Sequence, residues 1–147
     1  MAIGETPITL VGTVCSELAH RRVGEHELVN FWLRSTERRF DKEREAWVDG
    51  RHLLVRVTCW RRLAAGVRAS LRKGDPVIVN GRLHTRKYDE SGETRAVPEV
   101  EALAVGPNLM LCVAPAQRAG PAAGGEVGGD TLHTVDPALG EPARCGG

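Results

Sequence analysis

Cationic and aromatic side chains alternate with apolar ones along residues 77–88. Neighbouring side chains of a strand point to opposite faces, so this spacing separates the two kinds. The apolar set is Val77, Val79, Gly81 and Leu83, and the opposite set is Arg82, His84, Arg86 and Tyr88. Rings at strand spacing can stack on unpaired bases while guanidinium groups contact phosphates. The segment therefore favours sequence-tolerant binding of single-stranded nucleic acid.

Two earlier segments have the same alternation. In residues 28–39 the apolar side chains are Val29, Phe31 and Leu33, opposite Asn30, Trp32, Arg34, Thr36, Arg38 and, if the strand continues, Phe40. In residues 52–60 they are Leu53, Val55, Val57 and Cys59, opposite His52, Leu54, Arg56, Thr58 and Trp60. The alternative interpretation is that the arginines form a solvated face and that Trp32 or Trp60 covers the helix or a subunit contact.

Motifs of catalysis are missing from the sequence. It has no Gly-rich phosphate loop, nucleophile elbow or pair of histidines at metal-ligand spacing. Glu99 and Glu101 share a strand face and are expected to face solvent. We therefore expect no enzymatic activity, no cofactor and no metal. Two alternatives stay open: a protein-interaction module that uses the same face, and, with less support, a metal-dependent nuclease.

Composition predicts one domain followed by a tail. The chain has 147 residues, of which 41% are hydrophobic and 4% aromatic, and 20 Lys and Arg against 19 Asp and Glu. Residues 115–147 are mostly Gly, Pro and Ala and contain two arginines against four carboxylates. We expect a folded domain over 1–114 and a disordered tail over 115–147. No apolar run is long enough to span a membrane, which favours a cytoplasmic, nucleoid-associated protein.

The periodicity predicts five strands and one helix. Strands are expected over residues 8–14, 28–39, 53–60, 77–88 and 95–105, and the helix over 61–73, with Gly74 as its C-terminal stop. A long loop is expected at 40–51 and a hairpin loop at 89–93. This layout is typical of a five-stranded oligonucleotide-binding (OB) barrel, an all-β fold with one helix. A small sandwich is the alternative.

Four motifs resemble the bacterial single-stranded DNA-binding proteins: ITLVGTV, VNFWLRSTERRFDKEREAWVDG, LLVRVTCWRRLAAGVRASLRKGDPVIVNGRLHTRKY and EVEALAVGPNLML. They span residues 8–111, and the Trp47–Gly50 and Val105–Leu109 segments are most similar to actinobacterial members. The resemblance implies protection of single-stranded DNA during replication, recombination or repair.

The resemblance also implies roles for individual side chains. The stacking rings are expected at Phe40, Trp60 and Tyr88, and the phosphate-binding cations at Arg34, Arg56, Arg86 and Lys87. Leu54 stands where the family usually has Trp or Phe. Trp32 stands where a small residue is usual, on the same outward face. It is expected to replace part of the lost stacking, with packing at the barrel end as the alternative.

Assembly and partner recruitment are further implications. Family members form tetramers, and the apolar Leu109–Val113 run, interpreted as strand-like, is expected at a subunit interface. The four cysteines are expected to be free thiols, with an intersubunit disulfide through Cys15 or Cys112 as the alternative. The sequence ends without the acidic, hydrophobic tip of principal members. It resembles a second, accessory paralogue that recruits replication and repair proteins weakly, and a truncated sequence is the alternative.

Overall fold

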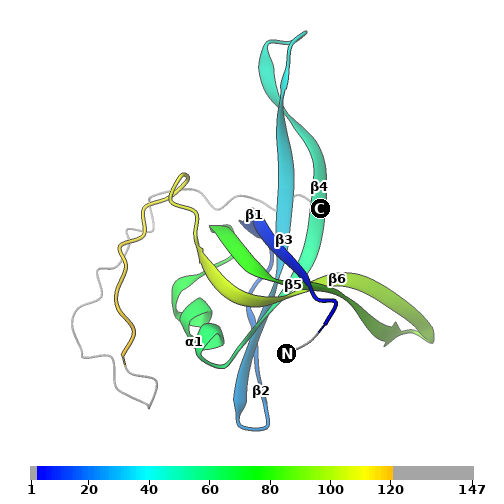
Figure 1. Ribbon diagram of the computed structural model, residues 1–147, viewed down its shortest axis with the longest axis vertical. Helices are drawn as coiled ribbons and strands as arrows, with labels where there is room; N and C mark the ends of the chain where they lie inside the picture. Colours follow the sequence, from blue (N-terminus) through cyan, green and yellow to red (C-terminus); the bar gives the residue numbers. More distant parts are fainter. Residues whose placement is uncertain (1–2, 121–147) are drawn as a thin grey trace.

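Five of the strands close into a barrel in the computed structural model, which describes residues 3–120 (Figure 1). The elements are β1 (Thr6–Val14), β2 (Ala19–Val23), β3 (His26–Asp41), β4 (Ala46–Trp60), α1 (Arg61–Ser70), β5 (Pro76–Glu90) and β6 (Glu93–Pro107). The sheet order is β1-β5-β6-β4-β3-β2, and β1 also pairs with β3. This second pairing closes the ring and leaves β2 outside it, attached only to β3. The predicted OB barrel with one helix is confirmed.

The core consists of the inward-facing residues that alternation predicts. Fully buried side chains come from every strand of the ring, with Phe31 and Leu33 the largest. The helix α1 packs Ala64 and Val67 against this core, and Leu71 follows at its end. Leu53, assigned to the apolar set, is instead exposed at 39% and lies outside the part of β4 that pairs with β6, residues 56–58.

The predicted loop at 40–51 is wrong. β3 and β4 continue as a long hairpin beyond the barrel (Figure 1), and only residues 42–45 form the turn. The carboxylate of Asp41 stabilises the turn by accepting hydrogen bonds from the backbone N–H groups of Glu43 and Arg44. Both faces of this hairpin are largely exposed, so its sequence has no apolar alternation to indicate strands.

β2 was also missed, for the same reason. All five of its residues are exposed, and it pairs with residues 26–30 of β3 through a tight turn that contains Gly24 at a φ of 63°. A strand without a buried face gives no period-two pattern. The barrel therefore carries an additional edge strand.

Two shorter expectations also differ from the structure. The helix ends at Ser70, three residues early, where Leu71 turns extended and donates its backbone N–H to Val67. Gly74, with a φ of 100°, instead forms the turn into β5 and donates to the carbonyl of Val14. The Leu109–Val113 run contains no strand: its first residues form a turn in which Leu111 donates to the carbonyl of Asn108.

Beyond β6 the structure describes residues 108–120, which contain no helix or strand. The expectations for the rest of the tail, including its C-terminal tip, fall on residues 121–147 and lie outside the described residues. Over residues 3–120, no helix is long and apolar enough to cross a membrane.

Candidate nucleic-acid interface

A continuous row of outward side chains crosses four strands of the barrel. Trp32 on β3 is paired with Arg56 on β4, Arg56 with Glu99 on β6, and Glu99 with His84 on β5. The pairing of β4 with β6 is parallel and spans only three residue pairs. It joins the two halves of the ring at the point where the cationic residues from each half meet. The barrel thus assembles one surface from residues 32, 56, 84 and 99.

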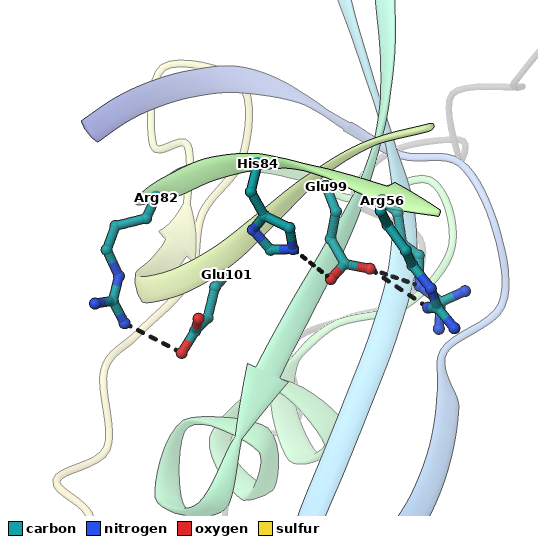
Figure 2. Close-up of polar contacts among 6 residues, drawn as sticks. Arg56, Arg82, His84, Glu99 and Glu101 are labelled. Atoms are coloured by element: carbon teal, nitrogen blue, oxygen red, sulfur yellow. Dashed lines mark hydrogen bonds and ion pairs between the residues drawn. The ribbon is translucent and has the colours of Figure 1, made fainter. Parts of the chain in front are cut away.

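Glu99 is the centre of this surface, and its expected exposure to solvent is wrong. Its buried carboxylate lies 3.2 Å from Nε of Arg56, 3.4 Å from Nη1 of Arg86 and 3.0 Å from Nε2 of His84. Figure 2 shows these contacts converging on the two carboxylate oxygens. The sequence places Glu99 on a mixed face, but only the parallel pairing with β4 brings Arg56 over it. Two predicted phosphate-binding cations are therefore already paired with a carboxylate.

Arg56 is nevertheless surrounded by more positive than negative charge. Burial lowers the pKa of its guanidinium, and the nearby cations Arg86 and Arg21 lower that pKa further, while Glu99 raises it. The buried Nε of Arg56 donates no hydrogen bond to any of the described residues. Glu99 thus offsets only part of the repulsion that Arg86 and Arg21 exert on Arg56.

Arg21 is a candidate cation that the sequence did not indicate. It lies on β2, opposite Leu28 of β3, and Leu28 is in turn opposite Trp60 of β4. Its position next to Arg56 becomes evident only once β2 is recognised as a strand on the edge of the barrel. Arg56 and Arg86 contact Glu99, and Arg21 acts electrostatically on Arg56; we call these three cations the Glu99 cluster.

Arg82 has the outward orientation expected from its spacing but lies in a different electrostatic setting. It donates hydrogen bonds to Glu5 over 2.8 Å and to Glu101 over 3.1 Å. These contacts raise the pKa of its guanidinium, with the hydrogen bond to Glu5 as the largest cause. Figure 2 shows the contact of Arg82 with Glu101 apart from the contacts of Glu99. Positive charge on β5 is therefore compensated at Arg82 and less so at Arg86.

The expected stacking rings do not form one compact group. Trp60 is partly exposed where β4 meets α1, and Tyr88 is partly exposed near the β5–β6 turn. Phe40 lies on the projecting β3–β4 hairpin, away from the barrel wall (Figure 1). Trp32 is half-buried beside Arg56, and Leu54 is exposed opposite Arg34. A DNA strand that contacts all these rings must therefore follow a long path over the protein.

The positions of Lys87 and Trp47 bear on the predicted set of binding residues. Lys87 alternates with Arg86 and Tyr88 and therefore points to the other side of β5. Trp47, which is not among the predicted site residues, is 62% exposed and lies opposite Phe40. Because a loop was expected at 40–51, Trp47 was not assigned to a strand face.

The described residues contain no group of three or more His, Cys, Asp or Glu side chains that could hold a metal. Glu99 and Glu101, the carboxylates that a nuclease would need on this face, are both engaged by cations.

Comparisons with known proteins agree on one family. The model of the Single-strand binding protein family matches residues 6–107. The single-stranded DNA-binding protein of Corynebacterium glutamicum is 44% identical over 120 residues, which cover 80% of this chain and 53% of that protein. That of Paenarthrobacter aurescens is 41% identical over 117 residues, covering 78% and 68%. The chain thus spans about half the length of the Corynebacterium protein.

Solved structures give the same result. A small single-stranded DNA-binding protein from Streptomyces coelicolor is 35% identical with a TM-score of 0.68, covering 74% of this chain and 98% of that one. The second single-stranded DNA-binding protein of Mycobacterium smegmatis is 39% identical with a TM-score of 0.63, covering 78% and 99%. These similarities agree with the actinobacterial character inferred from the motifs.

Proposed function

The chain belongs to the single-strand binding protein family, and we propose that it binds single-stranded DNA without sequence preference through the outward face of β3, β4 and β5. The observation that carries this proposal is the Glu99 cluster, in which Arg56 lies opposite Trp32 and is influenced by the charges of Arg21 and Arg86. Guanidinium groups next to an accessible ring fit a phosphate and its unpaired base. The family consists of binding proteins, and the chain is not an enzyme.

The rings of Trp60 and Tyr88 would extend this face, with Arg34 near Leu54 as a further phosphate contact. A duplex hides the base faces, whereas a single strand presents them, so the arrangement favours single strands. We propose that residues 1–114 form the binding unit. Lys87 has less support as a contact because it points to the other side of β5.

Homotetramer formation is a second part of the proposal. Leu109, Met110, Leu111 and Val113 are all exposed by more than half, and Leu103 on β6 is exposed as well. Adjacent apolar side chains of this kind usually lie at a contact between chains. Light scattering at micromolar concentration should give the mass of four chains, and a monomer would contradict it.

We also propose an accessory role in replication, recombination or repair. Support comes from the likeness to a small and to a second single-stranded DNA-binding protein of two actinobacteria. A strain that lacks the gene should grow normally but show a defect in one episode of DNA metabolism, and loss of viability would contradict this role.

The central test is a fluorescence titration of the full chain with oligo(dT) and with a duplex of the same length, at about 50 and 200 mM salt. We expect quenching of Trp fluorescence, preference for the single strand and a steep loss of affinity with salt. Equal affinity for both forms would contradict the proposal. Absence of oligo(dT) binding would favour the protein-interaction module, whose apolar contact with a protein partner should not weaken with salt.

A further inference from the structure

The buried carboxylate of Glu99 occupies a position in which it contacts two guanidinium groups of the proposed DNA-binding face. We infer that Glu99 is an internal competitor of the DNA phosphate: it holds Arg56 and Arg86 in the free protein and lowers the affinity of this face for single strands. The inference rests on the proposed function and specifies how its central site is regulated by its own sequence.

The geometry supports competition because the carboxylate is shared. Nε of Arg56 and Nη1 of Arg86 approach the same oxygen, Oε2, while Nε2 of His84 lies 3.0 Å from Oε1. The 3.2 Å contact of Arg56 is an ion pair in which Nε donates no hydrogen bond to Glu99, and the 3.4 Å hydrogen bond from Arg86 is longer than usual for a charge-assisted one. A guanidinium has five N–H donors and these contacts involve one nitrogen of each arginine, so each arginine has donors to offer to a second anion.

The charges around Arg56 independently support competition between Glu99 and a DNA phosphate. Arg21 and Arg86 both lower the pKa of Arg56, which means that each of them repels the Arg56 cation despite Glu99. A phosphate placed beside them would relieve this repulsion. The same phosphate would meet the negative charge of Glu99 nearby, which opposes binding. Removing that charge should strengthen binding more than the loss of the contacts weakens it, because the side chains of Arg56 and Arg86 are also partly buried, with exposures of 21% and 33%.

The alternative is that Glu99 only positions the arginines. A positioning role and a competing role predict opposite signs for the same substitution. If the carboxylate merely orients Arg56 and Arg86, its neutralisation must weaken binding. If it competes with phosphate, its neutralisation must tighten binding and make affinity more dependent on salt, because more phosphate charge is then neutralised by the protein.

The experiment compares the wild-type chain, Glu99→Gln, Glu99→Asp and Glu101→Gln in oligo(dT) titrations across a salt series. Glu99→Gln keeps the size of the side chain and removes its charge. We expect about 3- to 10-fold tighter binding at low salt and a steeper salt dependence. Glu99→Asp keeps the charge and should remain within about twofold of the wild type, by the same electrostatic reasoning.

Glu101→Gln is the matched control because it removes the same charge two residues away on the same strand. Its partner Arg82 stays paired with Glu5. We expect the affinity of this variant to stay within about twofold of the wild type. Equal tightening by Glu99→Gln and Glu101→Gln would mean that net charge alone is responsible, and it would overturn the inference.

A second variant covers the case in which Glu99→Gln fails to fold. In Arg86→Gln, Glu99 would pair wholly with Arg56, so both phosphate contacts are weakened. The salt slope should fall by more than the ~0.7 of one contact. A fall in the salt slope of ~0.7 or less overturns the inference. Weaker binding of oligo(dT) by folded Glu99→Gln also overturns it. If the wild type itself does not bind oligo(dT), the proposed function has failed instead.

Discussion

The rings of Phe40 and Trp47 meet edge to face across the β3–β4 hairpin, with centroids 5.7 Å apart and planes inclined by 66°. The two residues are directly opposite in the strand register. Their neighbours are charge pairs, Arg38 with Asp49 and Arg51 with Glu37. The hairpin thus presents rings with little uncompensated charge, in contrast to the Glu99 cluster.

The distance between the two regions makes the effect of Phe40→Ala dependent on oligonucleotide length. Phe40 lies eight residues from Trp32 along β3, or about 26 Å at ~3.3 Å per residue. We expect Phe40→Ala to weaken binding of long oligo(dT) by about 1–3 kcal/mol and to leave strands too short to span this distance unaffected.

Trp60→Ala and Tyr88→Ala are the comparison, measured by the same titrations. Each is expected to weaken binding of long oligo(dT) by ~1–3 kcal/mol, since both rings are accessible to solvent. An equal loss for short and long strands in Phe40→Ala, or no loss in any of the three variants, would contradict the assigned stacking roles.

Leu54→Trp should strengthen binding. Leu54 is exposed and lies opposite Arg34 in the strand register, so the indole ring introduced by Leu54→Trp would lie in solvent and not in the core. A stacked ring contributes about 1–3 kcal/mol, and titration with oligo(dT) measures the gain. Leu54→Gln is a suitable control, because it fills similar space without a ring and should not tighten binding.

Gly81→Ala should destabilise the barrel at the bulge between β5 and β6. A Cβ at residue 81 would lie 2.2 Å from the carbonyl oxygen of Glu101 and 2.8 Å from Cγ1 of Val100. Backbone atoms cannot move aside cheaply, so we expect a loss of about 1–3 kcal/mol in the free energy of unfolding, measured in urea.

Gly66→Ala in α1 provides the opposite control. A Cβ there meets no atom within 4 Å, so the substitution should stabilise the helix by about 0.5–1 kcal/mol. Unchanged stability of Gly81→Ala would show that the close packing at the bulge is absent.

The thiol of Cys59 should be unreactive in the folded protein. Burial raises its pKa from 9.0 to about 12. Above pH 9 the unfolded chain loses this proton while the folded chain keeps it, so stability falls as pH rises from 9 towards 12. The slope is about 1.4 kcal/mol per pH unit for one group. Urea unfolding of the wild type and Cys59→Ala across this range measures it, and equal pH dependence would contradict the assignment.

The sequence predicted the elements whose residues alternate between core and solvent. Val77 and Val79, or Phe31 and Leu33, reveal their strands because one face must be buried. The extended hairpin and β2 have no buried face and were missed, and with them Trp47 and Arg21. Glu99 could not be recognised as a partner of Arg56, since their contact depends on the parallel pairing of strands more than 40 residues apart in the chain.

The seam of the barrel consists of two residue pairs, Thr13 with Arg34 and Val14 with Leu33. The other edge of β1 pairs with β5 over eight residues that lie about 70 positions away in the chain. The β3–β4 and β5–β6 hairpins, by contrast, join neighbouring segments. Loop closure is therefore most costly for β1, and we expect it to dock last during folding and to open first. Amide hydrogens of β1 should therefore exchange faster than those of the central strands, and local opening of the barrel should begin at β1.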